Sequence, residues 1–293
     1  LDKLQPDLVV LLGDRYEIFA AATVCRLRGI RIAHISGGEL TAGAFDDCLR
    51  HCITKLSDLH FTATEEYRKR VIQLGEQPGR VFNVGELALA GLDRLQLKSR
   101  EQLETLLQTD LSEYFLVTVH SETCFPGAGL AIAETLVKLF KSEFAATGIV
   151  FTGANADPEG EQINALLEQE AARNDLFTFV RSLGRINYLS LARGAVCVIG
   201  NSSSGIAEVP ALATPVVNIG RRQDGRPHGS LVVSVSAEAE KILTAIRCVR
   251  KPEFRAAGKY NPYTGEDSAR QIAQIISAFD LSEIGRDKRF YDL

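Results

Sequence analysis

The sequence of 293 residues contains no methionine and no tryptophan, and only 5 histidines. No apolar run approaches the roughly 20 residues that a transmembrane helix needs, and no signal peptide opens the chain. The 6 cysteines lack CxxC spacing. This argues against a disulfide framework or a zinc site and predicts reduced, mostly buried thiols of a cytoplasmic protein. The net charge of −4 argues against nucleic acid as a partner, so an anionic substrate would need local donors.

The chain also lacks a start residue. Its opening, LDKLQPDLVVLLGD, is typical of a helix end that runs into a buried strand. A domain seldom begins there, so we expect the N-terminal part of the first domain to be missing. The length still suffices for two medium domains.

Short apolar runs alternate with amphipathic stretches. Helical patterns cover Tyr16–Leu27, Ile132–Phe140, Glu159–Ala172 and Ile186–Leu191. The strands are predicted at Leu8–Leu12, Ile30–Ile35, Leu59–Thr62, Val81–Val84, Phe115–Val119, Ile149–Thr152, Phe177–Val180, Val196–Ile199 and Val216–Ile219. Nearly continuous apolar strands that alternate with helices predict an α/β fold with parallel sheets covered on both faces.

The pattern restarts near the polar helical stretch Arg94–Ser112. We therefore expect two doubly wound domains, at residues 1–95 and from residue 96 onward. In such folds ligands bind beyond the carboxyl ends of the strands.

In the first domain, two predicted strands are followed by acidic side chains. Asp14 of GDRYE comes at a helix N-terminus, where a carboxylate can act as a cap. The stretch HISGGELTAGAFDDCLRH follows the next strand, and its Gly37 and Gly38 permit close approach of a ligand to the backbone.

Asp46 and Asp47 open the helix of that stretch, and Glu39 lies on the loop before it. Helical spacing predicts that Asp46 faces Arg50 and that Asp47 faces His51. These pairs would be routine surface ion pairs if they stood alone. Their position beside Asp14 favours a catalytic group of carboxylates.

In the second domain, GNSSSGIAEVP forms a strand-to-helix turn whose backbone N–H groups and hydroxyls suit a phosphate or diphosphate. Glu208, one helical turn further on, suits a ribose diol. The strand-end groups that complete this edge are His120, Arg221, Arg222 and Arg226. Arginine forks match phosphate oxygens well.

The motifs GDRYE, HISGGE with DD and RHCITKLSDLHF, GNSSSGIAE and NIGRRQDGR, in this order, resemble the UDP-N-acetylglucosamine 2-epimerases, specifically the hydrolysing type of bacterial sialic acid and nonulosonate biosynthesis. The resemblance covers nearly the whole chain. It implies the glycosyltransferase-B (GT-B) architecture, with two Rossmann-like domains that face a cleft, the second one (96–275) binding UDP. It also implies that the helix near Asp267–Phe279 crosses back and that residues 276–293 return to the first domain.

The resemblance also assigns roles to residues of this chain. The family's catalytic groups match Asp14, Asp46, Asp47 and His120. Several members carry a glutamate where this chain has Ser36, so Glu39 is our substitute for that acid or base. The UDP-binding residues would be Asn201, Ser202, Ser203, Gly205, Glu208 and Arg222.

The activity so implied converts UDP-N-acetylglucosamine and water to UDP and N-acetylmannosamine, by elimination of UDP to a 2-acetamidoglucal followed by hydration. We expect no cofactor, no metal, no membrane partner and a homodimer or homotetramer. Four alternatives stay open. They are a hydrolysing epimerase of a UDP-2,4-diacetamido-trideoxyhexose, a non-hydrolysing epimerase, a glycosyltransferase of the same architecture, and an inactive nucleotide-sugar-binding protein.

Overall fold

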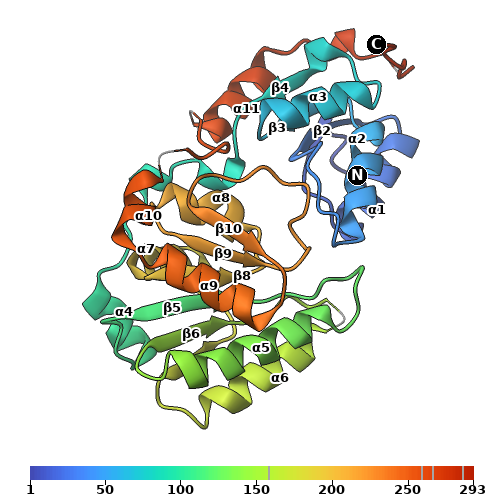
Figure 1. The fold of residues 1–293 in the computed structure, drawn as a ribbon. Helices are drawn as coiled ribbons and strands as arrows, with labels where there is room; N and C mark the ends of the chain where they lie inside the picture. Colours follow the sequence, from blue (N-terminus) through green and yellow to red (C-terminus); the bar gives the residue numbers. More distant parts are fainter. Residues whose placement is uncertain (158, 259, 266, 286) are drawn as a thin grey trace. The chain divides into compact units, whose positions relative to one another are not determined.

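Figure 1 shows the computed structural model, which describes residues 1–157, 159–258, 260–265, 267–285 and 287–293. The chain forms two compact units. Unit 1 comprises Leu1–Thr41, Phe45–Leu92 and Tyr263–Leu293, and unit 2 comprises Ala42–Ala44 and Asp93–Pro262. The chain thus rejoins unit 1 at Tyr263, earlier than the predicted return after residue 275. No apolar period marks this point, because the return is made by a loop whose buried Tyr263 bonds Tyr67 through their hydroxyls at 2.8 Å.

Unit 1 contains a parallel sheet in the order β1-β2-β3-β4. Its strands are β1 (Leu8–Leu12), β2 (Arg31–Ile35), β3 (Leu59–Thr62) and β4 (Val81–Asn83). Its helices are α1 (Tyr16–Leu27), α2 (Asp46–Leu56), α3 (Glu65–Gln73) and α11 (Ser268–Ala278), with the 3-10 turns η1 (Pro78–Arg80), η2 (Leu87–Leu89) and η4 (Leu281–Glu283).

Successive side chains of β2 point to opposite faces of this sheet. Ile32 packs with Cys25 of α1 and Ile53 of α2. Ala33 packs on the opposite face with Ile272 of α11. The register sets Leu12 of β1 beside Ile35 of β2 and sets Ile35 beside Phe61 of β3, so the loops that follow these strands leave the same edge.

Unit 2 contains a parallel sheet in the order β10-β9-β8-β5-β6-β7. Its strands are β5 (Tyr114–Thr118), β6 (Gly148–Thr152), β7 (Phe177–Val180), β8 (Cys197–Gly200), β9 (Val216–Ile219) and β10 (Val232–Val235). The chain builds outward from β5 to β7 and then continues on the other side with β8. The gap between β5 and β8 is therefore the topological switch point, where ligands bind in such sheets.

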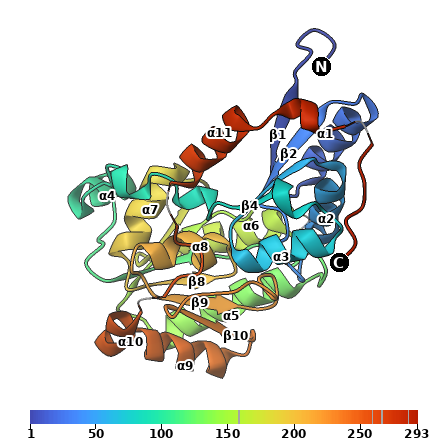
Figure 2. The same cartoon turned by 90° about the horizontal axis from the view of Figure 1, so that it is seen from above.

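Helices cover both faces of the second sheet (Figure 2). One face carries α5 (Ala128–Glu143), α6 (Gly160–Ala171) and α9 (Ala239–Val249), and its core centres on Phe115 and Phe140. The other face carries α7 (Gly184–Gly194) and α8 (Ser204–Ala211). The chain enters this unit within η3 (Leu92–Arg94), and the unit also contains α4 (Arg100–Leu107) and α10 (Pro252–Ala257).

The structure confirms the predicted fold class of two parallel α/β domains, and each of the nine predicted strands is present to within one residue. The expectation of mostly buried thiols is wrong. All 6 cysteines are free, but only Cys25 and Cys197 are buried, while Cys48, Cys52, Cys124 and Cys248 are exposed. Cys48 and Cys52 lie four residues apart on α2, on the side that faces away from the sheet. Apolar character alone did not reveal which face of a helix is covered.

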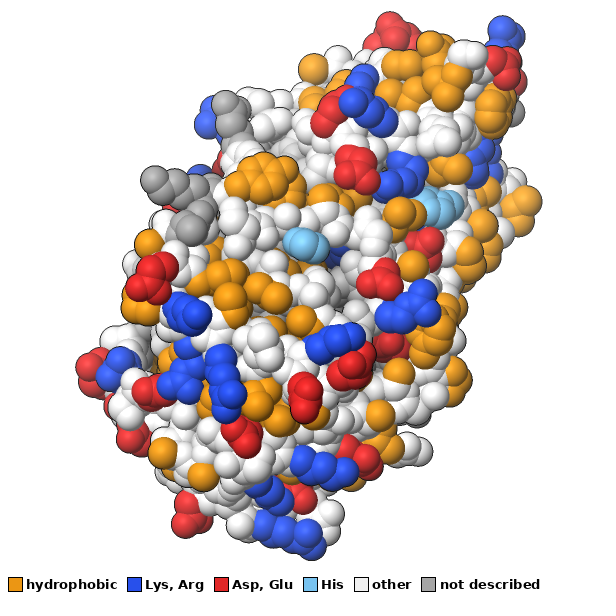
Figure 3. All heavy atoms as spheres, in the orientation of Figure 1, with side chains coloured by type: hydrophobic (Ala, Val, Ile, Leu, Met, Phe, Trp, Pro, Cys, Tyr) orange, Lys and Arg blue, Asp and Glu red, His pale blue; other side chains and the backbone are white. Residues whose placement is uncertain are grey.

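The surface drawn in Figure 3 intersperses acidic and basic side chains over both units and shows no single basic stripe. Within the described residues, no helix has the length and apolar character needed to cross a bilayer.

Candidate active site

Asp14 leaves β1 directly but does not cap α1, which corrects one interpretation of the sequence. The N-cap position of α1 is Arg15, and its first turn receives no side-chain hydrogen bond from that residue. The Asp14 carboxylate instead accepts a hydrogen bond from the Arg50 guanidinium of α2. The structure thus brings Asp14 of GDRYE into contact with α2, the helix that follows the HISGGE loop in unit 1.

Arg50 is the centre of this group, since its side chain is only 3% exposed. Its Nη1 donates to the Glu39 carbonyl at 3.0 Å and to Thr41 Oγ1 at 2.9 Å, and it lies 3.5 Å from Asp47 Oδ1. Asp47 Oδ1 also accepts the backbone N–H of Thr41 at 2.5 Å. One guanidinium therefore fixes Asp14, the Glu39 loop and the start of α2.

Helical spacing predicted part of this arrangement. Asp47 lies 3.7 Å from His51 Nε2, as expected, and burial lowers the pKa of His51. Asp46 and Glu39 are both buried. Arg50, however, extends to Asp14 as well as to its own helix, which a local pattern does not reveal.

The two glycines of HISGGE face protein rather than open space, which corrects their interpretation as freedom for a ligand. A Cβ on Gly38, whose φ is +79°, would lie 2.4 Å from the Tyr67 carbonyl of α3. A Cβ on Gly37 would lie 3.0 Å from Thr54 Oγ1 of α2 and 3.1 Å from His34 Nδ1. The loop therefore rests tightly on α2 and α3. Ser36 also adopts a positive φ of 68°, which is strained for a serine.

The buried His34 of β2 also stabilises the carboxyl edge of this sheet. It is fully buried, and burial lowers its pKa to about 3, so the ring is neutral. Its Nε2 lies 2.9 Å from the Gly13 carbonyl and its Nδ1 lies 3.2 Å from Thr54 Oγ1. These partners assign the proton to Nε2 and fix the exit of β1 just before Asp14.

In unit 2 the serine turn starts at a glycine that no other residue could replace. Gly200 has φ of +138°, and a Cβ there would lie 1.9 Å from the Thr118 carbonyl of β5. The next residue, Asn201, is fully buried. Its Oδ1 accepts the His120 N–H at 2.7 Å, and its Nδ2 donates to the His120 carbonyl at 2.9 Å. The Asn201 side chain therefore positions His120, and its role as a UDP ligand stays a prediction.

His120 is itself nearly buried and neutral. Burial, helped by the charge of Arg222, lowers its pKa to about 3. Its Nδ1 accepts the Asn155 N–H at 3.1 Å, so the ring proton lies on Nε2. This favours a hydrogen-bond donor over the general acid that the sequence also allowed.

Sequence reasoning missed Glu122, a buried carboxylate two residues after His120. Its Oε1 accepts the backbone N–H groups of Arg221 at 2.8 Å and Arg222 at 3.1 Å. Arg222 Nη1 in turn donates to the Asn201 carbonyl at 3.3 Å. The arginine turn after β9 is therefore tied to the serine turn after β8. The SET sequence after His120 was the only available signal.

The same turn explains why Ala42–Ala44 belong to unit 2. A Cβ on Gly43 would lie 2.7 Å from Arg222 Cα, and the Gly43 carbonyl accepts the Cys124 N–H at 3.2 Å.

The serine turn opens α8, and the positive end of this helix lies at the turn. The N–H groups of Gly205 and Ile206 donate to the carbonyls of Ser202 at 3.1 Å and of Ser203 at 3.0 Å. Ser203 is the N-cap but makes no side-chain capping bond, so its exposed hydroxyl remains available together with that of Ser202. Gly205 is buried against Val216, where a Cβ would lie 3.2 Å away, so it serves packing against the sheet. Glu208 lies 3.9 Å from Arg185 Nε, and burial raises its pKa. Hydroxyls, the positive end of a helix and a carboxylate thus follow one another from β8 into α8.

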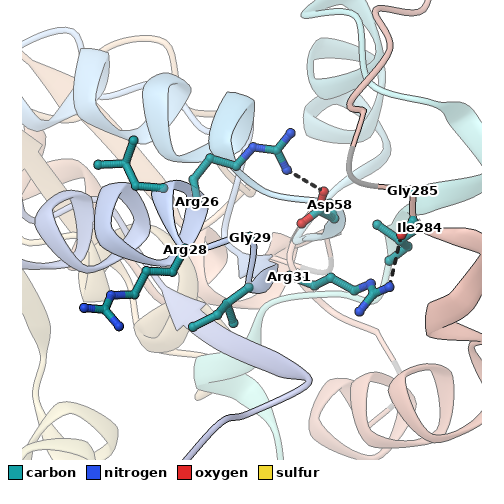
Figure 4. A pocket seen from close by; sticks show the side chains of 9 residues that line it. Arg26, Arg28, Gly29, Arg31, Asp58, Ile284 and Gly285 are labelled. Carbon is teal, nitrogen blue, oxygen red and sulfur yellow. Dashed lines mark hydrogen bonds and ion pairs between the residues drawn. The ribbon is translucent and has the colours of Figure 1, made fainter. Parts of the chain in front are cut away.

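Unit 1 also has a hollow of about 430 Å³ at the opposite, amino-terminal edge of its sheet (Figure 4). Its arginines are already bound: Arg26 to Asp58 at 3.2 Å and Arg31 to the Ile284 carbonyl at 3.2 Å. The C-terminal end of α1, with its partial negative charge, also lies at this edge. We therefore place the active site at the carboxyl edge.

The fold defines a two-domain α/β protein of the GT-B type, and the residues after β8 and β9 are a candidate site for an anionic ligand in unit 2. The chain belongs to the UDP-N-acetylglucosamine 2-epimerase family, whose family model matches residues 1–277. This match confirms that the motifs resemble those of the UDP-N-acetylglucosamine 2-epimerase family.

Curated relatives support this placement. The polysialic acid biosynthesis protein P7 of Escherichia coli is 38% identical over 292 residues, covering 98% of this chain and 74% of that protein. The GDP/UDP-N,N'-diacetylbacillosamine 2-epimerase (hydrolyzing) of Campylobacter jejuni is 40% identical over 259 residues, covering 87% of this chain and 66% of that protein.

Solved structures share the fold. The UDP-GlcNAc 2-epimerase of Neisseria meningitidis bound to UDP-GlcNAc matches with a TM-score of 0.79 at 19% identity, over 94% of this chain and 78% of that one. The enzyme of Methanocaldococcus jannaschii in complex with UDP-GlcNAc and UDP matches with a TM-score of 0.78 at 20% identity, over 94% and 77%.

Proposed function

We propose that this protein is a hydrolysing 2-epimerase that converts UDP-N-acetylglucosamine and water to UDP and N-acetylmannosamine. The observation that carries the proposal is the buried Arg50, which holds Asp14, the Glu39 loop and Asp47 at one sheet edge. The hydrolysing reaction is supported by the C. jejuni relative, whose name states it.

In unit 2, the first turn of α8, the hydroxyls of Ser202 and Ser203, Arg222 and the Nε2–H of His120 bind the diphosphate. Glu208 accepts the ribose hydroxyls. These donors stabilise the negative charge that UDP gains as it leaves, and a fixed donor of this kind is typically worth about 3 kcal/mol at a transition state.

The carboxylates of unit 1 transfer the protons. One of Asp14, Glu39, Asp46 and Asp47 takes the C2 proton while the C1–O bond breaks and UDP departs with the bonding electrons. The product is a 2-acetamidoglucal. Water then adds its oxygen to C1 and gives up one proton to a carboxylate of this group, while a second carboxyl group delivers a proton to the other face of C2. Each such transfer contributes roughly 10²- to 10⁴-fold.

The second candidate is the same reaction on UDP-N,N'-diacetylbacillosamine, a UDP-2,4-diacetamido-trideoxyhexose. It is favoured by the relative of 40% identity and by Ser36, which stands where several epimerases carry a glutamate. The two sugars differ at C4 and C6, whereas the groups proposed for the reaction act at C1 and C2.

The test is turnover of both UDP-sugars by the full-length protein, followed by NMR of the products. We expect free UDP together with a free 2-epimerised sugar from one of them. An intact epimerised sugar nucleotide would indicate the non-hydrolysing type. Binding of UDP without turnover of either sugar would contradict an enzymatic function.

A further inference from the structure

A buried carboxylate in unit 1, remote from the proposed reaction, gathers basic groups from three elements. Glu76 follows α3 and is 3% exposed. Its Oε1 lies 2.7 Å from Lys55 Nζ of α2, and its Oε2 lies 2.9 Å from His60 Nε2 of β3 and 2.7 Å from Lys288 Nζ. Lys288 belongs to the segment after η4, which ends the chain beside α2 (Figure 2).

Lys288 also closes the end of α2. Its ammonium group donates to the carbonyl of Thr54, in the last turn, at 3.3 Å and to the carbonyl of Ser57, the C-cap residue. A cation at this position hydrogen-bonds the last carbonyls of the helix and matches the negative end of the helix dipole.

Further contacts hold the segment around Lys288 against the residues that follow α3. The Phe290 ring fills the space beside Gly75, where a Cβ would lie 2.3 Å from the ring, and it lies 4.9 Å from Lys55 Nζ. The Tyr291 N–H donates to the Gly75 carbonyl at 2.9 Å. The segment is thus fixed by charge, by packing and by a backbone bond.

The charges of this cluster can contribute to the folded protein in two ways, through the position of its elements or through its free energy of unfolding. Burial acts to raise the pKa of Glu76, but the hydrogen bond from His60 and the charge of Lys288 outweigh it and bring this pKa to about 2. Burial lowers the pKa of Lys288 to about 8, because removal from water disfavours the charged form of the amine. A buried ion pair of this kind adds little net stability and can instead fix how elements join.

Both helices joined by the cluster support the proposed active site. The N-terminal half of α2 carries Asp46, Asp47 and Arg50, and α3 supports Gly38 through the Tyr67 backbone and a hydrogen bond from Arg70. We propose that Lys288 is a positioning residue: through Glu76 and the last carbonyls of α2, it locks α2 and α3 together and thereby holds Asp47 and Arg50 in their catalytic geometry. The kinetic part of this inference rests on the proposed function.

The test compares Lys288→Met with Arg289→Met in the full-length protein. Arg289 is the adjacent cation, but its side chain is 84% exposed and bonds only its neighbour Asp287 in the described structure. We expect Lys288→Met to lower kcat about 10- to 100-fold, because small displacements of catalytic groups have effects of this size. The KM for the UDP-sugar should change less than about threefold, since the proposed UDP-binding residues lie in unit 2. Arg289→Met should remain within about twofold of wild type in both constants.

A second variant separates position from stability. Lys288→Met leaves Glu76 with one fewer positive partner, whereas Lys288→Met with Glu76→Gln removes both charges. The double variant should regain thermal stability but not kcat. Recovery of kcat together with stability would overturn the proposal.

Hydrogen exchange of the α2 amides tests the lock without any substrate. The amides of residues 50–56 should exchange about tenfold faster in Lys288→Met than in Arg289→Met, because loss of Lys288 makes local opening of α2 easier. Equal exchange in the two variants would overturn the lock. Absence of turnover in wild type, with faster exchange in Lys288→Met, would contradict the proposed function and leave the lock supported.

Discussion

At the residue scale, the buried Arg50 guanidinium decides where the carboxylates of unit 1 point. It bonds Asp14 from β1 and approaches Asp47 from its own helix, so neither carboxylate is free to turn toward solvent. Fixed carboxylates suit proton transfer, because the reaction requires a short, defined path to the C2 proton.

Replacing Asp14 with Asn should therefore remove a proton acceptor while keeping the size of the side chain. We expect kcat to fall about 10²- to 10⁴-fold, with the thermal unfolding temperature changed little. The matched control is Asp2→Asn, since Asp2 also pairs with an arginine of unit 1, Arg28, but in an exposed position. Steady-state kinetics and thermal melts of both variants test this. Unchanged turnover in Asp14→Asn would remove this residue from the mechanism.

The buried histidines predict how stability depends on pH. The pKa values of His34 and His120 are lowered by burial to about 3, while an unfolded histidine titrates near 6.5. The unfolded chain therefore binds more protons below pH 6.5. Stability is complete above that pH and is lost as the pH falls from 6.5 toward 3, by at most about 1.4 kcal/mol per pH unit for each histidine.

His120→Gln should reduce this pH dependence between pH 6.5 and 5. Urea unfolding at pH 7, 6 and 5 measures it. His228→Gln serves as the control, because His228 is exposed in the same unit and should leave the slope unchanged. A slope in His120→Gln equal to that of wild type would show that the buried ring does not set it.

The sequence singled out Asp14 and Arg50 but did not reveal that they contact each other. Asp14 and Arg50 are 36 residues apart, and their contact depends on the register of β1 and β2. Helical spacing reveals only neighbours three or four positions away. Glu122 and Lys288 were missed for the same reason, since each acts on backbone far along the chain.

At the element scale, strands were predicted well where both faces are buried. β5 is buried at every position and appears as an unbroken apolar run. β10 was missed, because it lies at the edge of its sheet and is only partly buried, which leaves no such run. α3 was missed because only Tyr67 and Val71 of its nine residues are buried, too few for a clear helical period.

The turn after β9 gives a prediction at this scale. Glu122→Ala leaves the Arg221 and Arg222 amides without their acceptor, so the turn that presents Arg222 should shift. We expect the KM for the UDP-sugar to rise about tenfold, which corresponds to the loss of about 1.4 kcal/mol of binding. Glu134→Ala, on the exposed side of α5, is the control and should have no effect. Equal KM values in the two variants would contradict the role of Glu122.

At the scale of the whole molecule, the two units carry different chemistry. The residues proposed to bind the diphosphate belong to unit 2, and the carboxylates proposed for proton transfer belong to unit 1. Binding of UDP and turnover of the sugar should therefore be separable by mutation.

Thermal shift with UDP tests this division. A ligand at 100 times its Kd stabilises the folded protein by about 2.7 kcal/mol. Asp14→Asn should keep the full UDP-induced shift of wild type and lose turnover. Glu208→Ala should lose most of the shift and turnover as well, because its proposed contact is to the ribose. The decisive quantity is the UDP-induced shift of Glu208→Ala relative to that of Asp14→Asn. A variant that is only less stable still shows the increase in unfolding temperature that UDP causes. If both variants lost the UDP shift equally, binding and proton transfer would not be divided between the units.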